Sequence, residues 1–145
     1  MADDHDPDLS MESSLKHLSS RPHSVAALVA AAMVGTPARA ELINVQWDGQ
    51  GAYERPVQIE AGKLVEVCTR LTRGQTIAWS FKSLTALNFN VHYHEGQKVV
   101  FPEKRDAVAE LSGELKVPVD QDYCWMWSNK AGVATSLSVR LQRQP

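Results

Sequence analysis

His92 and His94 have the residue type and spacing best suited to chemistry in this chain. Residues two apart on a β-strand point to the same side of a sheet. Both imidazoles are therefore expected on one face, opposite the apolar side chains of Val91 and Tyr93. Neutral imidazole is a common protein nitrogen ligand for transition metals. The pair predicts a chelating metal site.

Met126 supplies a further candidate ligand, at a position of the same parity as Cys124 on its own expected strand. Two histidines with a thioether suit copper, and Cys124 is a fourth ligand if it is not oxidised. Glu95 is then an oxygen ligand or a hydrogen-bond acceptor for one of the histidines. A simpler interpretation needs no metal, with two solvated histidines and a methionine packed between tryptophans. Both interpretations stay open, because an isolated H-x-H pattern is unspecific.

Cys68 and Cys124 are the only cysteines, 56 positions apart. In an exported domain with two cysteines a disulfide is the default expectation. Closing a loop of this length would contribute roughly 4 kcal/mol by restricting the unfolded chain. The alternatives are thiolate metal ligands and a redox-active thiol. Neither alternative is supported by a C-x-x-C spacing.

Catalysis finds little support in the sequence. A Cys–His nucleophile needs a free thiolate, which a disulfide removes, and no G-x-S-x-G motif is present. Asp120 and Asp122 flank Gln121 near an expected turn, where capping or solvation is their simplest role. We therefore predict no catalytic residue and no enzyme, with a thiol-dependent enzyme as the weakest alternative.

Trp125 and Trp127 offer a second kind of site. Both share a strand face with Tyr123, and the simplest place for that face is the core. If the face opened at a sheet edge, the two indoles would form a binding surface for a ligand or a protein.

The elements that must position these residues are strands. Apolar side chains after Glu41 alternate with a period of two, and no window shows helical spacing. We expect an all-β, antiparallel β-sandwich of about eight short strands, with a closed barrel as the alternative. Ser112-Gly113 predicts a hairpin turn, and Asp48 to Gly51 predicts another. Strand candidates include Ile43–Trp47, Leu64–Cys68, Ile77–Phe81, Leu87–Tyr93, Val99–Phe101, Ala107–Leu111, Glu114–Val119, Tyr123–Trp127 and Leu137–Leu141.

The first forty residues read as a different region. Residues 3–12 carry five acids and no base, residues 16–23 are basic, and residues 25–35 form a short apolar run before Ala38-Arg39-Ala40. Basic, apolar and small-x-small segments in this order are typical of a secretory signal, and the run is too short to span a membrane. We predict cleavage after Ala40, giving a leader over 1–40 and one domain over 41–145, exported to the periplasm or secreted. A start at Met11 would remove the acidic stretch.

The predicted mature part has no net charge. Of the 15 basic and 17 acidic residues in the whole chain, 3 and 5 fall in residues 1–40, leaving 12 of each. A neutral domain gives no broad electrostatic case for binding nucleic acid or an anionic membrane. The expected partner is an unknown protein or small ligand, and no transmembrane segment is expected in this part.

Residues 113–140 resemble the end of a GOLD (Golgi-dynamics) domain. The run Gly113-Glu114-Leu115-Lys116-Val117, followed by residues 122–129 (DYCWMWSN), is similar to that family's glycine, apolar strand, Tyr, Cys, aromatic and Asn pattern. Cys68 with residues 74–81 (GQTIAWSF) resembles its earlier cysteine strand, and residues 89–91 (FNV) take the place of its Phe-x-Ile/Val strand.

The likeness covers about eighty residues, from Val65 to Leu141, in the family's order. It implies a β-sandwich, often with a disulfide between the matching cysteines, and a non-catalytic binding module. The family's coiled coil and membrane anchor are not expected here. The sequence thus favours an exported, non-enzymatic binding module, with a periplasmic copper-binding protein as the alternative.

Overall fold

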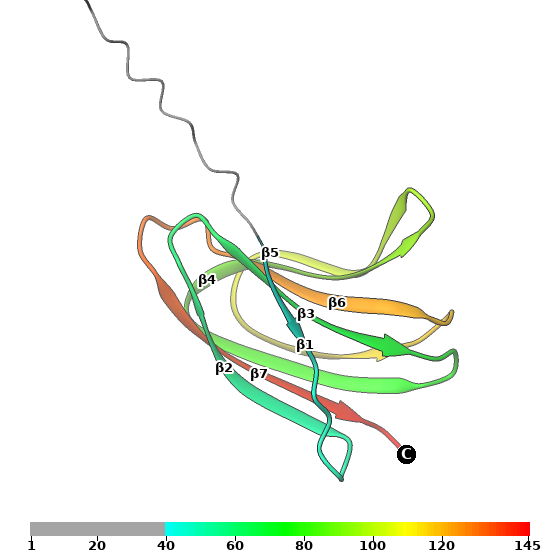
Figure 1. Ribbon diagram of the computed structural model, residues 1–145. Helices are drawn as coiled ribbons and strands as arrows, with labels where there is room; N and C mark the ends of the chain where they lie inside the picture. Colours follow the sequence, from blue (N-terminus) through cyan, green and yellow to red (C-terminus); the bar gives the residue numbers. More distant parts are fainter. Residues whose placement is uncertain (1–39) are drawn as a thin grey trace, which may run out of the picture. The chain divides into compact units, whose positions relative to one another are not determined.

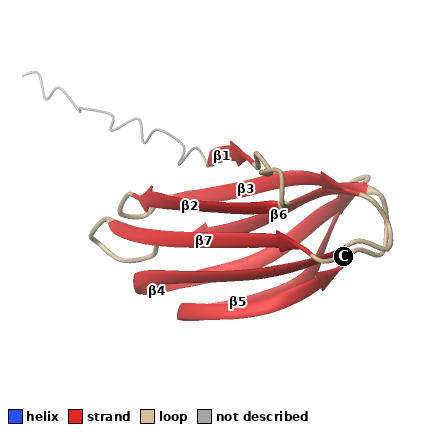
Figure 2. Cartoon of the chain, turned by 90° about the horizontal axis from the view of Figure 1, so that it is seen from below, coloured by secondary structure: helices blue, strands red, loops and turns tan. Residues whose placement is uncertain are grey.

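The computed structural model describes residues 40–145, so the predicted leader, apart from Ala40, lies outside the described residues. The regular structure in this part of the chain is all strand, which confirms the predicted all-β class (Figure 2). The strands are β1 (Glu41–Asn44), β2 (Ala52–Ile59), β3 (Leu64–Leu71), β4 (Thr76–Glu95), β5 (Lys98–Lys116), β6 (Gln121–Ser128) and β7 (Thr135–Arg143).

None of the described residues forms a helix long and apolar enough to cross a membrane.

The strands form one curled sheet rather than the expected sandwich of about eight short strands. Its order is β1-β3-β6-β4-β7-β2, with β5 paired to β4, and all neighbours are antiparallel except β1 and β3. The first part of β4 pairs with β7, and its last part pairs with β6. Because β4 belongs to both halves, they form one continuous sheet, and this sheet is curled (Figure 1).

The two longest strands each combine segments that the sequence separates. β4 joins the expected strands at 77–81 and 87–93, and its pairing with β5 shifts register between Lys82 and Leu87. The backbone of Ala107 in β5 has a φ of 55°, and its N–H donates to Asn88 Oδ1 at 3.1 Å. Irregular pairing of this kind bends a strand and increases its twist. Because of this bend, β4 and β5 each span segments that were expected to be separate strands.

The predicted hairpin at Ser112-Gly113 is wrong, because β5 runs through both residues. Gly113 pairs with Trp79, and a Cβ added to it would lie 2.6 Å from an indole carbon. The glycine is explained by this close approach of the ring, not by a turn.

The Asp48 turn is confirmed. Its carboxylate accepts hydrogen bonds from the N–H groups of Gln50 and Ala52, both at 2.8 Å. These two bonds stabilise the charged form and lower the pKa of Asp48. Gly51 follows with a φ of 71°, in the left-handed region that glycine adopts without strain.

The hydrophobic core fills the inside of the curl. Alternate residues of the strands point into it, as the period of two predicts. Phe89 is at its centre, with its ring 4.9 Å from that of Trp79 and 5.5 Å from that of Trp127. The largest fully buried side chains are Trp125, Trp127, Tyr123, Phe89, Ile59, Leu71, Ile77, Leu87, Leu137, Leu141, Val65 and Val67.

Candidate functional site

Three chemically active side chains lie in one row on the outer side of the sheet. Cys68 of β3 is the direct partner of Cys124 of β6, and Cys124 is in turn the partner of His92 of β4. The two cysteines form a disulfide, which confirms that prediction. The row exists because β6 lies between β3 and β4 in the sheet.

His92 is held in one orientation. Its side chain is 6% exposed, and Nδ1 lies 2.8 Å from Asn90 Oδ1. An amide oxygen only accepts, so Nδ1 carries the hydrogen and donates it. The lone pair then resides on Nε2, the atom a metal or a hydrogen-bond donor would use.

Burial favours the neutral form of the His92 ring. Loss of solvent lowers the pKa of His92, the negative charge of Glu66 acts in the opposite direction, and His94 lowers the pKa further. A neutral imidazole at ordinary pH is a ligand rather than a cation.

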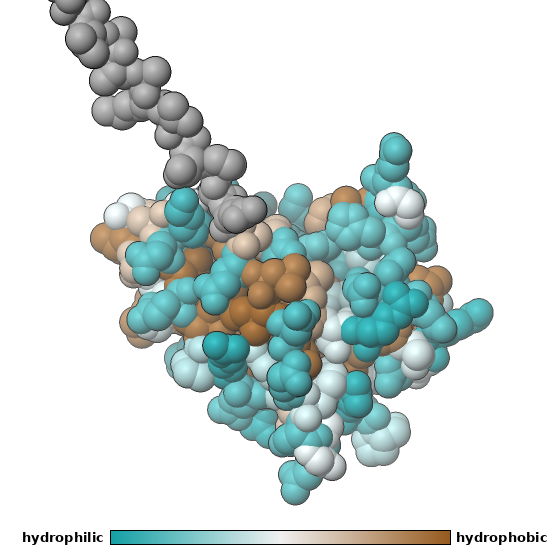
Figure 3. Space-filling view, in the orientation of Figure 1, coloured by the Kyte–Doolittle hydropathy of each residue, from teal (hydrophilic) through white to brown (hydrophobic). Residues whose placement is uncertain are grey.

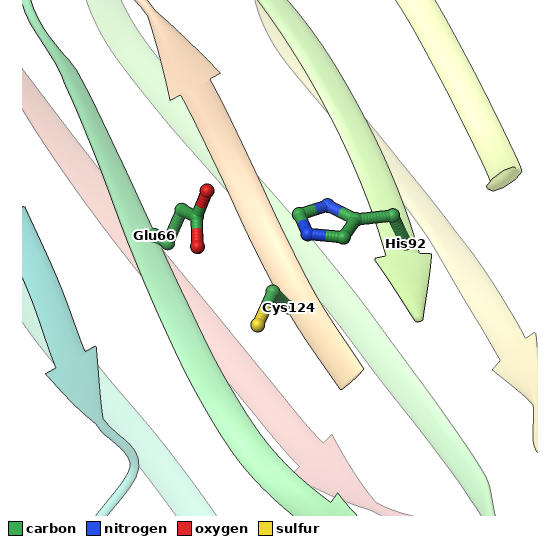
Figure 4. A group of neighbouring side chains, drawn as sticks. All are labelled: Glu66, His92 and Cys124. Carbon is green, nitrogen blue, oxygen red and sulfur yellow. The ribbon is translucent and has the colours of Figure 1, made fainter. Parts of the chain in front are cut away.

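Glu66 completes the group from β3. Its carboxylate, a ring nitrogen of His92 and Sγ of Cys124 all lie within 4.8 Å of one another. Figure 4 shows the carboxylate and the imidazole facing each other across β6. Glu66 was not predicted as a site residue, although its position two residues before Cys68 places it on the same strand face.

A groove adjoins this group. The ring of Phe101 lies 6.0 Å from that of His92, and the Lys104 ammonium lies 5.7 Å from the centre of the Phe101 ring. The groove has a volume of about 280 Å³ and also contacts Asn90 and Met126. Phe101 itself is 48% exposed, so a solvent-facing ring lies against one side of His92.

The predicted copper ligands do not converge. His94 lies beside His92, with ring centres 5.6 Å apart. Met126 pairs with Asn90, on the other side of His92 along β4. Four residues of strand separate the levels of His94 and Met126, or roughly 13 Å at 3.3 Å per residue. Copper binding by this set stays a prediction without geometric support.

Glu95 is also placed differently from the expectation. It is the last residue of β4, and its carboxylate acts on the hydroxyl of Tyr93, whose pKa is raised by burial and then by Glu95. Tyr93 points away from the histidine side, as strand alternation requires. Glu95 therefore lies on the Tyr93 side of β4 and not on the side of the histidines.

Trp125 and Trp127 do not form the proposed binding surface. Their exposed fractions are 0% and 1%, so the face that they share is the core. The curl of the sheet closes over this face, and the sequence pattern alone could not show which of the two interpretations holds. Both indole nitrogens are buried without a hydrogen-bond partner among the described residues.

A second groove crosses the outer side of the other half of the sheet. Its volume is about 490 Å³, and Ser80, Ser112, Arg140 and the ion pair of Lys82 with Glu110 line it. The ion pair joins β4 to β5 with a separation of 3.4 Å between its charged atoms. The groove is open to solvent, and it could not be predicted from the sequence because its residues come from four separate strands.

One end of the sheet is fixed by Asn129. This buried side chain donates to the carbonyls of Ile59 at 3.1 Å and Val133 at 2.8 Å, while its own oxygen accepts from the N–H of Ala131 at 3.0 Å. The bonds tie the loop after β6 to the end of β2. Val133, in this loop, is 62% exposed.

Leu84 lies at the same end of the sheet and is 82% exposed. Its neighbour Ser83 lies 3.3 Å, hydroxyl to hydroxyl, from Thr135, two residues after Val133. A second exposed apolar group lies at the start of β5, where Val99 is 37% and Phe101 48% exposed. Figure 3 shows hydrophobic side chains also gathered over β1 to β3, within a mostly hydrophilic face.

Neither the protein-family models nor the curated proteins give a match to this chain. The GOLD likeness therefore remains a resemblance in the order of motifs.

Solved structures of lysozyme inhibitors share the fold. PliG of Aeromonas hydrophila, a periplasmic inhibitor of g-type lysozyme, is 16% identical, with a TM-score of 0.61 over 73% of this chain and 98% of that chain. PliG of Salmonella Typhimurium is 15% identical, with a TM-score of 0.55 over 72% and 99%. A mutant of the Escherichia coli PliG is 13% identical, with a TM-score of 0.50 over 73% and 100%. At these identities the likeness establishes the β-rich fold.

Proposed function

We propose that this chain is an exported, non-enzymatic module that binds a protein, and that the protein is a lysozyme whose activity it inhibits. The observation that carries the proposal is the fold, which matches nearly the whole length of three PliG inhibitors. The disulfide between Cys68 and Cys124 supports it, because such bonds persist in oxidising compartments such as the periplasm.

The Asn129 end of the sheet is the surface best suited to hold a protein partner. Its loop is fixed before binding, so little conformational entropy is lost on association. Leu84 and Val133 are the two most exposed large apolar side chains among the described residues, and both lie at this end. Apolar side chains on an ordered loop can bury their surface in a partner without rearranging the fold.

The proposal is tested by measuring lysis of bacterial cell walls by a g-type lysozyme as the protein is added. Dose-dependent suppression that saturates near one inhibitor per enzyme is expected, with c-type and i-type lysozymes measured alongside to establish specificity. Absence of both inhibition and binding for all three types would refute the proposed function.

Two variants locate the contact surface. Leu84→Asp combined with Val133→Asp is expected to weaken inhibition at least about tenfold, since loss of buried apolar contacts and burial of two carboxylates each oppose binding. Phe101→Asp is the matched control on the other exposed apolar group and is expected to inhibit normally. The reverse pattern would move the surface to the start of β5 while leaving the inhibitor proposal in place.

A further inference from the structure

The row of Cys68, Cys124 and His92, with Glu66 beside it, has a use that lysozyme inhibition does not require. We propose that reduction of the disulfide converts this group into a binding site for a zinc-type divalent cation. The ligands are the thiolates of Cys68 and Cys124, Nε2 of His92 and the carboxylate of Glu66.

The donor set fits the chemistry of zinc. Zinc is bound in proteins by thiolate, imidazole and carboxylate ligands, in a tetrahedral arrangement with bonds of about 2.0–2.3 Å. Two sulfurs, one nitrogen and one oxygen are four ligands of these types. Three of the four groups, those of Glu66, His92 and Cys124, already have their ligand atoms within 4.8 Å of one another.

The backbone holds the fourth ligand in place. Cys68 and Cys124 are directly opposed on paired strands, with Cα atoms 4.1 Å apart, and both side chains are on the outer side of the sheet. The ladder of β3 with β6 extends from Leu64 to Leu71, so backbone pairing on both sides of Cys68 keeps the cysteines together when the sulfur bond is broken. Side-chain rotation alone then separates the two sulfurs enough to receive an ion.

His92 is prepared for the role. Its Nδ1–H donates to Asn90, which leaves the Nε2 lone pair free, and its ring is buried. Metal-binding histidines commonly use their second nitrogen in this way, to fix the ring and its tautomer. A histidine on a solvent-exposed strand face would need none of these features.

The chemical steps balance with a dithiol as the reductant. The Cys68–Cys124 disulfide takes two electrons and two protons from the dithiol, which becomes a disulfide itself, and two thiols form. The cation then forms two metal–sulfur bonds, and both thiol protons pass to solvent. With the disulfide intact only His92 and Glu66 remain as ligands, so the oxidised protein is expected to bind the cation far more weakly.

Cobalt(II) is a suitable probe of the site in the full chain. After reduction with a dithiol and removal of the reductant without oxygen, one equivalent of cobalt is expected to produce a sulfur-to-cobalt charge-transfer band. Zinc is expected to displace the cobalt and abolish the band, and the oxidised protein is expected to show no band. Histidines elsewhere in the chain do not produce this signal, because the band reports sulfur ligands only.

Variants distinguish this site from chance binding. His92→Ala is expected to weaken cobalt binding at least about tenfold, and Glu66→Gln is expected to weaken it less. His94→Ala is the matched control, since it removes the neighbouring imidazole on the same side of β4 and should leave the band unchanged. Equal effects of the two histidine variants would overturn the proposal.

The reduced chain also has a readout in its folding. If reduction abolishes the β-sheet circular dichroism signal, zinc is expected to restore it in the wild type and in His94→Ala but not in His92→Ala. If the reduced chain stays folded, zinc is expected to raise its melting temperature in the same two proteins. A reduced wild-type chain that neither binds cobalt nor responds to zinc would refute the proposed site.

Discussion

Gly113 and Trp79 show how one residue can be set by a distant contact. The two are direct partners in the pairing of β4 with β5, and the indole lies across the glycine where a side chain would be. Trp79 is 5% exposed, so its ring is packed on its other side and has little room to withdraw. The glycine lets the ring cover the strand backbone.

Gly113→Ala is therefore expected to destabilise the fold by about 1–3 kcal/mol, the usual range for an overpacked site. The measurement is the free energy of unfolding in urea. Gly49→Ala is the matched control, because an added Cβ at Gly49 meets nothing within 4 Å. Trp79→Phe removes the obstructing ring atoms, and Gly113→Ala is expected to be less harmful in that background. Equal losses for Gly113→Ala with and without Trp79→Phe would contradict the explanation.

The turn at Asp48 predicts a pH dependence. Backbone hydrogen bonds from Ala52 and Gln50 lower the pKa of Asp48 below 3.8, so the folded state favours the charged carboxylate more than the unfolded state does. This contribution is complete above the unfolded pKa and is lost as the pH falls through the folded pKa. Asp48→Asn removes the charge while keeping an acceptor oxygen.

We expect Asp48→Asn to be less stable than the wild type at neutral pH, with the difference shrinking as the pH falls below 3.8. Urea midpoints at several pH values measure this. Asp106→Asn, an equal loss of charge on β5, serves as the control. A stability difference for Asp48→Asn that stays constant down to the lowest pH would show that its charge contributes nothing specific.

At the scale of the element, the bend shared by β4 and β5 determines the architecture. Ala107 adopts a φ of 55°, a region disfavoured for residues with a Cβ by roughly 1–2 kcal/mol. The Asn88 side chain compensates by accepting the N–H of Ala107 at 3.1 Å. The bend in this 19-residue strand thus combines one strained residue, Ala107, with one hydrogen bond to the side chain of Asn88.

Ala107→Gly is expected to stabilise the fold by about 0.5–1 kcal/mol, because glycine adopts a positive φ without a steric penalty. The matched control is Ala109→Gly, two residues further along β5, where the same substitution should destabilise by a similar amount. Thermal and urea unfolding of both variants measure the effect. If the two substitutions destabilise equally, the conformation of Ala107 carries no strain.

β5 also illustrates what sequence could and could not predict about the elements. The period of two correctly indicated strands, because alternation records the inner and outer sides of a sheet. It could not distinguish one long bent strand from several short ones, since Ser112-Gly113 resembles a turn when its cross-strand neighbour is unknown. The bend itself depends on a contact between Asn88 and Ala107, nineteen residues apart.

The candidate site, like the strands, was predictable only in part. Alternation correctly placed His92 and His94 on one side, and the cysteine count predicted the disulfide. Strand register was not available from the sequence, so Met126 was assigned to the histidines although it pairs with Asn90. The same missing register concealed Glu66, which lies near His92 only because β3, β6 and β4 are neighbours.

At the scale of the whole molecule, the Cys68–Cys124 bond closes a long loop of the chain that contains the two longest strands. The two cysteines are 56 positions apart in sequence, and the segment between them includes β4 and β5, which complete the curl of the sheet. In the folded state the bond adds little further constraint on the positions of β3 and β6, because these strands already pair on both sides of it. Its main effect is therefore expected in the unfolded chain, which the bond restricts.

Replacing both cysteines, Cys68→Ala with Cys124→Ala, is expected to lower the free energy of unfolding by roughly 4 kcal/mol while leaving the native fold in place. Because the uncrosslinked unfolded chain is more expanded, the dependence of that free energy on urea should also become steeper. The lytic assay at low temperature provides the control for the native state, since the proposed contact surface at Leu84 and Val133 lies in other elements. A large loss of stability with an unchanged urea dependence would instead locate the contribution in the folded sheet, through the contacts of the sulfurs with His92 and its neighbours.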